Sequence, residues 1–247
     1  MKKITTVVDQ FYSFIKKDKK GNNSNHRFSQ WDYCYNFFKN NREVLQAKPT
    51  KELKYQACLQ LAFYLASWGM FRGSTGLLWK SSNTFEPIVQ ILCKDKYDGL
   101  IYQSGKNPLL NPSKYCKCLE ALYEELSKCI RSIKYFKPGK NTQKISPTPT
   151  LITKIILGTL GAAPAFDNYF SKGLRKMKKE FYQRDKNTQS KSHHEDKMHN
   201  IFERDITWLI LFFYDNNKEE INKLCKDHNA TPMKIIDTYI WQIGKPI

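Results

Sequence analysis

The chain has 247 residues, and 41 Lys and Arg against 23 Asp and Glu give it a formal net charge of +18. With 40% hydrophobic and 14% aromatic residues it can form a real core, so a chain disordered throughout is not expected. The longest apolar run, residues 206–214, falls short of the roughly 18 residues that cross a bilayer. We therefore expect a cytoplasmic protein without a membrane partner and with a polyanion as its first candidate partner.

The excess of basic residues has two interpretations. Of the 41 basic residues 34 are Lys and seven are Arg, and an abundance of Lys and Asn also follows from an AT-rich genome. Because Arg is the side chain best suited to planar recognition of phosphate and guanine, a surface dominated by Lys indicates diffuse attraction to a nucleic-acid backbone. The composition thus leaves open a nucleic-acid partner, whether DNA or RNA, and a basic protein without that role.

Apolar residues recur every three to four positions along most of the chain, which predicts helices. In the first part of the chain these are expected at residues 4–15, 29–42 and 53–70. The third is apolar on most sides and is therefore expected to be central and buried.

The loop that follows, residues 71–79, contains Arg72, two hydroxyl residues and two glycines. Its backbone amides suit a phosphate, but it lacks the Gly-Lys-Ser/Thr of a P-loop, and two glycines are equally what a tight turn requires. We favour the turn. Arg72 stays a candidate nucleic-acid ligand, because an Arg buried amid Trp68, Phe71 and Trp79 would need an anionic partner.

Asn111-Pro112 predicts a helix start. The apolar residues after it have heptad spacing: Tyr115, Leu119, Leu122, Leu126, Cys129, Ile133 and Phe136. Such a stripe fits a coiled-coil partner or a core helix of a bundle, and we favour the bundle because the pattern ends at Lys137-Pro138-Gly139. The polar, proline-rich residues 137–150 are the best boundary between an N-terminal lobe, residues 1–136, and a C-terminal lobe, residues 151–247.

The second lobe continues the helical pattern. Helices are expected at residues 151–160, 164–184, 196–215, 218–227 and 232–242. Without convincing strand alternation, the chain is predicted to be all-α, with about nine or ten helices in one compact two-lobed domain.

Cysteine and histidine spacings argue against a metal centre. The seven cysteines are odd in number and lie mostly in apolar helical faces, which indicates a reducing compartment. Cys116 and Cys118 are too close for a zinc knuckle, and His194 and His199 are five apart, so that they would not share a helix face. We expect no metal and no cofactor.

The most suggestive segment runs from Thr150 to Lys179: an apolar helix, a Gly-rich turn, Pro164, and then Asp167 at the start of a basic helix. A carboxylate in this setting is suited to activate a water or to stabilise a developing cation. Aromatic residues interleave with a basic run that extends to Lys191 and offer stacking surfaces for unpaired bases. The cations expected to hold a phosphate chain are Lys172, Arg175, Lys176, Lys178 and Lys179.

Residues 150–175 resemble the part of the helix-hairpin-helix DNA glycosylase superfamily in which an apolar helix, a Gly and a Pro-Val-Asp motif precede a basic helix. The resemblance implies an all-helical two-lobed fold, a DNA substrate and a catalytic carboxylate at Asp167. The sequence departs from the family at four points: residues 147–150 replace the glycine hairpin, Tyr169 replaces a His, the nucleophilic Lys is missing, and so is the four-Cys cluster. The alternative is that Asp167 caps or salt-bridges a surface helix.

Two hypotheses about function follow. The first is a basic helical protein that binds nucleic acid through residues 172–191, with base-excision chemistry at Asp167. The second is a non-catalytic helical protein-interaction module, of the kind found in mobile elements or defence systems, whose heptad stripe and exposed aromatic residues dock a protein partner.

Overall fold

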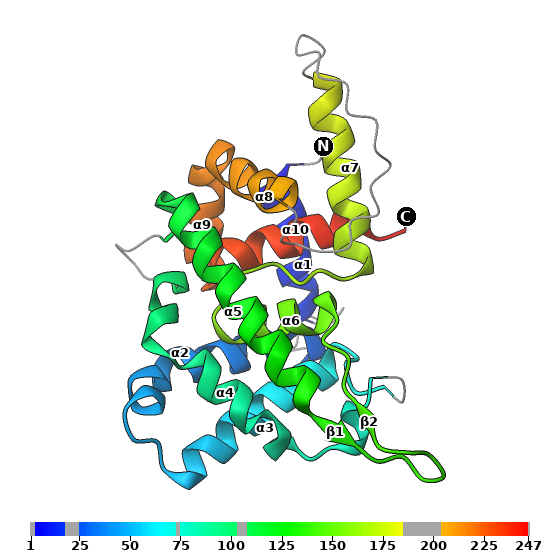
Figure 1. Ribbon diagram of the computed structural model, residues 1–247. Coiled ribbons are helices and arrows are strands. Elements are labelled where there is room, and N and C mark those ends of the chain that lie inside the picture. Colours follow the sequence, from blue (N-terminus) through cyan, green and yellow to red (C-terminus); the bar gives the residue numbers. More distant parts are fainter. Residues whose placement is uncertain (1–2, 18–24, 73–74, 103–107, 185–203, 247) are drawn as a thin grey trace.

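The computed structural model describes residues 3–17, 25–72, 75–102, 108–184 and 204–246, and in these residues the chain is all-α, as predicted (Figure 1). The α-helices of this part are α1 (Ile4–Lys16), α2 (Gln30–Gln46), α3 (Lys51–Ser67), α4 (Glu86–Leu92), α5 (Pro112–Ser132), α6 (Pro149–Thr159), α7 (Asn168–Arg184), α8 (Arg204–Asn216), α9 (Lys218–His228) and α10 (Pro232–Gly244). Short 3₁₀ helices are η1 (Arg27–Ser29), η2 (Leu77–Trp79), η3 (Ser82–Phe85), η4 (Asp95–Leu100) and η5 (Pro108–Leu110).

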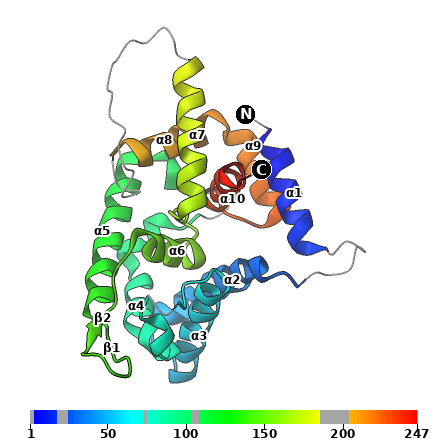
Figure 2. The ribbon, with the colours of Figure 1, turned by 90° about the vertical axis from the view of Figure 1, so that its right-hand side faces the viewer.

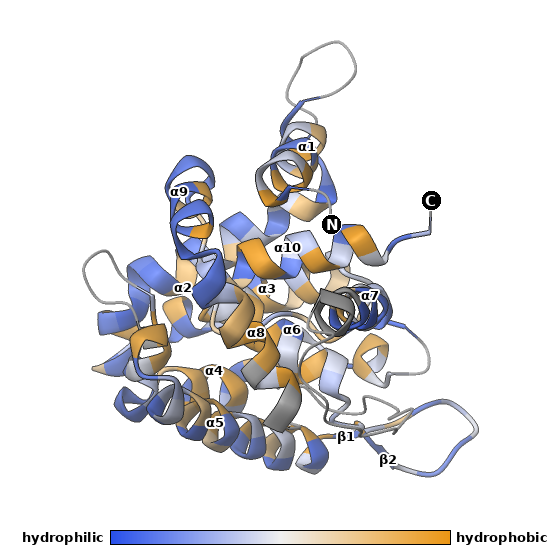
Figure 3. Ribbon diagram, turned by 90° about the horizontal axis from the view of Figure 1, so that it is seen from above, coloured by the Kyte–Doolittle hydropathy of each residue, from blue (hydrophilic) through white to orange (hydrophobic). Residues whose placement is uncertain are grey.

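Helix α10 crosses the middle of the molecule and packs against α1, α7, α8 and α9 (Figures 1 and 2). Nearly all of its residues are buried, and these include the charged residues Lys234 and Asp237. Thr231 caps it by accepting a hydrogen bond from the Lys234 amide at 3.2 Å, and Pro232 occupies the first turn. Seen from above, hydrophobic and hydrophilic residues alternate along α10, whereas α7 and α9 are largely hydrophilic (Figure 3).

Helix α6 is the second buried helix, and every residue from Leu151 to Thr159 lies in the interior. It packs against α2, α3 and α5. The indole Nε1 of Trp31, on α2, donates to the carbonyl of Leu157 at 2.8 Å. Gly158 lies so close to the ring of Tyr64 that a Cβ there would approach a ring atom to 2.2 Å, so α6 and α3 meet at the glycine.

Helix α5 carries the predicted heptad stripe, and the four residues Tyr115, Leu119, Leu122 and Leu126 are buried. They face α4, α6 and η4 of the same chain, which agrees with a core helix and leaves this stripe covered. The helix ends at Ser132, so Phe136, which the heptad pattern included, lies beyond it and is exposed.

A small β-hairpin follows α5, where the heptad pattern predicted that the helix continues. Strands β1 (Lys134–Tyr135) and β2 (Gln143–Lys144) pair antiparallel, with Lys134 opposite Lys144. The turn between them contains Gly139 at a φ of 72°, a backbone conformation that favours glycine. Two-residue strands are too short to show an alternating pattern, so the sequence did not indicate them.

Helix α1 packs with the end of the chain. His228 on α9 and Asp9 on α1 approach to 2.7 Å between Nε2 and Oδ1, and the rings of Phe11 and Trp241 meet edge to face at 6.3 Å. One hydrophobic cluster includes residues from both ranges of the predicted division. The boundary at 137–150 stays a prediction. Helix α1, which that division assigns to the first lobe, packs against α9 and α10 of the second.

In the described residues no helix is both long and apolar enough to cross a membrane. The seven cysteines are free thiols; four are buried in the helical core and three, all on α5, are half-buried.

Candidate functional site

Asp167 lies immediately before α7 and caps it. Its Oδ1 accepts hydrogen bonds from the amides of Tyr169 and Phe170, both at 3.1 Å. Its Oδ2 lies 3.1 Å from the Nζ of Lys154, on α6. Both oxygens are therefore engaged by the protein itself, and the side chain is only 18% exposed. This is the arrangement of a helix cap with a salt bridge, and a catalytic role for Asp167 stays a prediction.

The interior beside Asp167 holds a cluster of charges that sequence reasoning missed. The ammonium group of Lys154 lies over the ring of Trp68, 4.4 Å from its centre. A second buried lysine, Lys234 on α10, lies 5.3 Å from the same ring centre and 3.7 Å from the carboxylate of Asp237. Asp237 in turn accepts a hydrogen bond from the Ala165 amide at 2.8 Å. The core thus contains two lysines and two aspartates around one tryptophan.

A signal for this cluster was present in the sequence. Lys154 is the one charged residue in the apolar run from Leu151 to Leu160, and Lys234 and Asp237 lie in an equally apolar helix. A charged residue inside a wholly apolar helix must be buried with a partner, because an unpaired charge in the core is very costly.

Burial perturbs the two charges on α10 in opposite directions. Removal from water raises the pKa of Asp237 to about 6, although Lys234 and Lys154 oppose the rise. Removal from water also lowers the pKa of Lys234 despite the nearby carboxylates of Asp237 and Asp32. The charged form of each group is thus disfavoured in the folded protein.

The raised pKa of Asp237 predicts a pH-dependent contribution to stability. Because the folded state binds this proton more tightly than the unfolded state, the contribution is complete below the unfolded pKa of about 4 and is lost as pH rises through about 6. Relative to Asp237→Asn, the wild type should lose on the order of 2–3 kcal/mol of unfolding free energy between pH 4 and 7.5. Urea denaturation of both proteins across this range measures the difference.

Asp95, an exposed aspartate on η4, provides the control for removing one carboxylate. Asp95→Asn should follow the wild type across the same pH range. A difference between wild type and Asp237→Asn that stays constant from pH 4 to 7.5 would contradict the assignment.

Cations lie directly over aromatic rings on the surface next to this cluster. Lys172 is 5.8 Å from the ring centre of Tyr169, and Lys245 is 4.0 Å from that of Trp241. The two rings meet edge to face at 5.7 Å. We call this set of contacts the cation–aromatic strip, and its members are Lys172, Tyr169, Trp241, Lys245, Phe28 and Arg27. Of its three rings Tyr169 is exposed, whereas Trp241 and Phe28 are buried beneath the cations.

The strip continues to η1 through two contacts. The ring of Phe28 meets that of Trp241 at 5.5 Å, and the guanidinium of Arg27 lies 5.0 Å from the ring centre of Phe28. Burial lowers the pKa of the neighbouring His26, and the charges of Arg27 and Lys245 lower it further. The two cations therefore lie close enough to act on one imidazole.

Besides Lys172, helix α7 has three more exposed cations on its outer face: Arg175, Lys176 and Lys179. The opposite face, with Phe170, Leu174 and Met177, is buried. The Nζ of Lys176 donates to the carbonyl of Ile243 at 2.8 Å and so ties α7 to the end of α10. Lys178 is half-buried. The remainder of the basic run, residues 185–191, lies outside the described residues.

Arg72 is exposed, so the premise that it is buried among aromatic residues was wrong, and its role as a nucleic-acid ligand stays a prediction. Its Nε donates to the carbonyl of Gly69 at 2.6 Å, and the hydroxyl of Thr75 donates to the carbonyls of Met70 and Arg72. These contacts bring Thr75 next to Met70 and Arg72, whereas residues 73–74 lie outside the described residues. Gly76, at a φ of 77°, lies against the ring of Tyr135, where a Cβ would clash.

Two clefts open on the described surface. One, of about 310 Å³, lies between α2, η4 and the end of α6, next to the ion pair of Arg42 and Asp98. The other, of about 510 Å³, lies between η1, α2 and α3. Neither is lined by Asp167 or by a cation of α7.

Among the residues that the structure describes, no three His, Cys, Asp or Glu side chains are grouped so as to hold a metal ion. Cys116 and Cys118 lie on α5, and the segment from His193 to His199 falls outside the described residues.

Comparisons with known proteins identify no family: no protein-family model matches the chain, and neither a curated protein nor a solved structure does.

Proposed function

We propose that this protein binds nucleic acid along the cation–aromatic strip and the outer face of α7. The proposal rests on one observation, the row of three cations, Lys172, Lys245 and Arg27, each held over an aromatic ring. A row of cations suits a polymer with a charged backbone. The exposed ring of Tyr169 can stack on a base, whereas the buried rings of Trp241 and Phe28 hold the cations above them in place. The net charge of +18 acts in the same direction by attracting polyanions from a distance.

Salt dependence tests the proposal. If the protein neutralises some six to ten phosphates, its affinity for an oligonucleotide should fall by about 10³- to 10⁵-fold between 50 and 200 mM salt, because counterions are released on binding. Fluorescence anisotropy with labelled single-stranded DNA, duplex DNA and RNA measures the affinity. Absence of binding to all three at 50 mM salt would overturn the proposal.

A matched pair of triple variants separates a localised site from general basicity. Changing Lys172, Arg175 and Lys179 to Gln removes three charges from α7, and should weaken binding by at least tenfold and reduce the salt slope by about three. Changing Lys117, Lys128 and Arg131, which are exposed on α5, to Gln removes the same three charges elsewhere. Equal losses in the two variants would show that binding follows net charge alone.

Base excision at Asp167 is the catalytic form of this proposal. It is supported by a carboxylate fixed by two amides and a lysine at the start of the basic helix α7, where it is suited to stabilise a developing cation electrostatically. Its oxygens, however, are already engaged and the side chain is mostly buried, so this form of the proposal requires the local structure to open.

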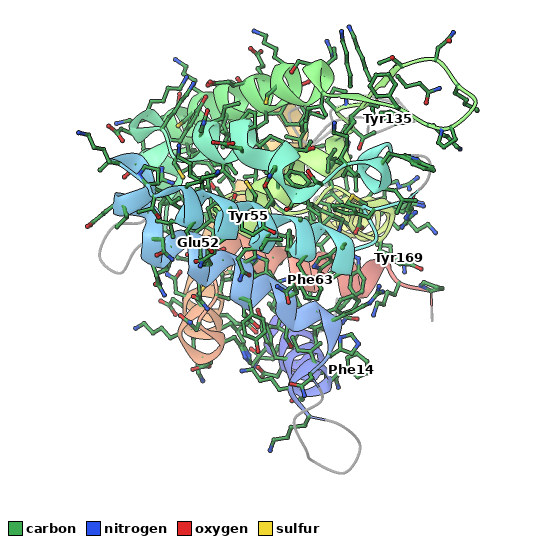
Figure 4. The ribbon with its side chains drawn as sticks, turned by 90° about the horizontal axis from the view of Figure 1, so that it is seen from below. Phe14, Glu52, Tyr55, Phe63, Tyr135 and Tyr169 are labelled. Atoms are coloured by element: carbon green, nitrogen blue, oxygen red, sulfur yellow. The ribbon has the colours of Figure 1, made fainter. Side chains whose placement is uncertain are left out.

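A second candidate function, docking of a protein partner, is favoured by the outer face of α3. Tyr55, Leu59 and Phe63 are exposed at intervals of four residues, with Phe63 64% exposed (Figure 4). Apolar residues at this spacing form the stripe that a helix presents to a partner groove. Binding to a protein that changes little between 50 and 200 mM salt, with no affinity for oligonucleotides, would favour this function.

A further inference from the structure

The cleft between η1, α2 and α3 is the larger of the two described above, at about 510 Å³. Its walls come from the first turn of α2 and the last turns of α3. Two aromatic side chains line it, Tyr33 on α2 and Phe63 on α3, and each is 64% exposed. Aromatic rings of this size are normally buried, so the exposure of both at one cleft leaves two faces open to a ligand.

The remaining lining residues are polar or small. They are Asn25, His26, Arg27, Ser29, Gln30, Ala66 and Ser67. Amide and hydroxyl groups both donate and accept hydrogen bonds, as the edge of a nucleobase requires. No carboxylate lines the cleft, so nothing in its wall repels a phosphate.

The cleft is continuous with the cation–aromatic strip. Arg27 belongs to both, and its Nη1 donates to the carbonyl of Ser67 at 3.1 Å, which fixes the guanidinium at the rim. The pKa of His26, which also lines the cleft, is lowered by burial and then by Arg27 and Lys245. A nucleic-acid strand whose phosphates follow the cations of the strip therefore stays next to positive charge until it reaches the cleft.

We infer that this cleft holds an unpaired nucleobase of a single-stranded DNA whose phosphates follow Arg27 and Lys245. The inference rests on the proposed function and makes it specific, because it predicts a preference for unpaired over paired DNA. A base inside a duplex has both faces stacked and its edge paired, so it cannot use Tyr33 and Phe63. The volume lies within the range of about 300–1,000 Å³ of small-ligand sites.

The first test compares variants in binding to a labelled single-stranded DNA and to the duplex of the same sequence. Tyr33→Ala and Phe63→Ala should each weaken binding of the single strand by roughly 5- to 150-fold, the usual effect of removing one base-stacking ring. Both should leave duplex binding within about twofold. Tyr33→Phe, which keeps the ring, should bind as the wild type does.

Tyr55→Ala is the matched control, since Tyr55 is also an exposed aromatic residue on α3 but does not line the cleft (Figure 4). It should leave binding of the single strand unchanged. A strand of the same length without bases should bind the wild type more weakly, and Tyr33→Ala should not weaken it further. RNA of the same sequence shows whether the sugar matters.

The outcomes separate this inference from the proposed function. If Tyr33→Ala and Phe63→Ala bind the single strand like the wild type while the α7 triple variant does not, the cleft assignment is wrong and nucleic-acid binding stands. Equal affinity for single strand and duplex, or full affinity for the base-free strand, also overturns the cleft assignment. If no oligonucleotide binds the wild type, the proposed function itself fails.

Discussion

Gly173→Ala is expected to lower the free energy of unfolding by about 2–3 kcal/mol, because α7 and α10 meet backbone to backbone at this residue. A Cβ on Gly173 would lie 1.9 Å from the carbonyl oxygen of Ile240. A Cβ on Gly244 would likewise lie 1.8 Å from that of Tyr169. Neither clash is with a flexible side chain, so relief requires the two helices to separate. Urea denaturation measures the loss.

Gly99→Ala is the control for this substitution. Gly99 is exposed in η4, and a Cβ added there meets nothing within 4 Å. Its replacement should change the free energy of unfolding by no more than about 0.5 kcal/mol. Equal losses at the two positions would show that the close contact of α7 with α10 does not hold.

The same contact bears on the proposed function. Tyr169 and Lys172 are on α7, whereas Trp241 and Lys245 are on or directly after α10. Separating the helices moves the two halves of the cation–aromatic strip apart. A Gly173→Ala protein that still folds should therefore bind nucleic acid more weakly than the wild type, whereas Gly99→Ala should not.

The all-α fold and the buried stripe of α5 were predictable because they depend on local spacing. Leu119, Leu122 and Leu126 repeat at the helical period, and that period places them on one face whatever covers it. Asn111 at the start of α5 and Thr231 at the start of α10 accept hydrogen bonds from the third residue after each. Such caps are likewise a property of a few consecutive residues.

The contacts between distant segments were not predictable from spacing. Asp167, Lys154 and Asp237 come from three elements, and no periodicity relates residues 83 positions apart along the chain, as Lys154 and Asp237 are. The packing of α1 against α9 and α10 is of the same kind. Asp167 was found by its place before a basic helix, but its partner Lys154 was not.

The cleft was missed for a different reason. Phe63 lies in the helix that was predicted to be central and buried, and that prediction was wrong: α3 buries only one face, and Phe63 is on the exposed one. Tyr33 lies in α2, where an aromatic residue is likewise expected to belong to the core. Sequence spacing gives the direction of a side chain around its own helix, but it does not show whether a neighbouring helix covers that direction. Only the arrangement of α2 beside α3 shows that both rings are open to solvent.

Asp167→Ala is expected to destabilise the protein by about 3–5 kcal/mol, the usual result of removing one partner of a buried ion pair. The variant loses the cap of α7 and leaves Lys154, whose side chain is 3% exposed, without its nearest carboxylate. Asp167→Asn should lose less, because Asn also accepts amide hydrogen bonds at a helix start. Denaturation midpoints of the two variants separate the cap from the ion pair.

Adding Lys154→Met to Asp167→Asn should recover most of the lost stability, because no unpaired charge then remains beside Trp68. A double variant that is less stable than Asp167→Asn would contradict the ion pair as the source of the loss.

The double variant also separates an effect on folding from an effect on catalysis. If the wild type and Lys154→Met release bases from duplex DNA and the folded double variant does not, the carboxylate takes part in the reaction. Equal turnover in the wild type and the double variant would limit Asp167 to holding α7 against α6, since a carboxylate that steadies a reacting sugar cannot be replaced by an amide without loss of rate.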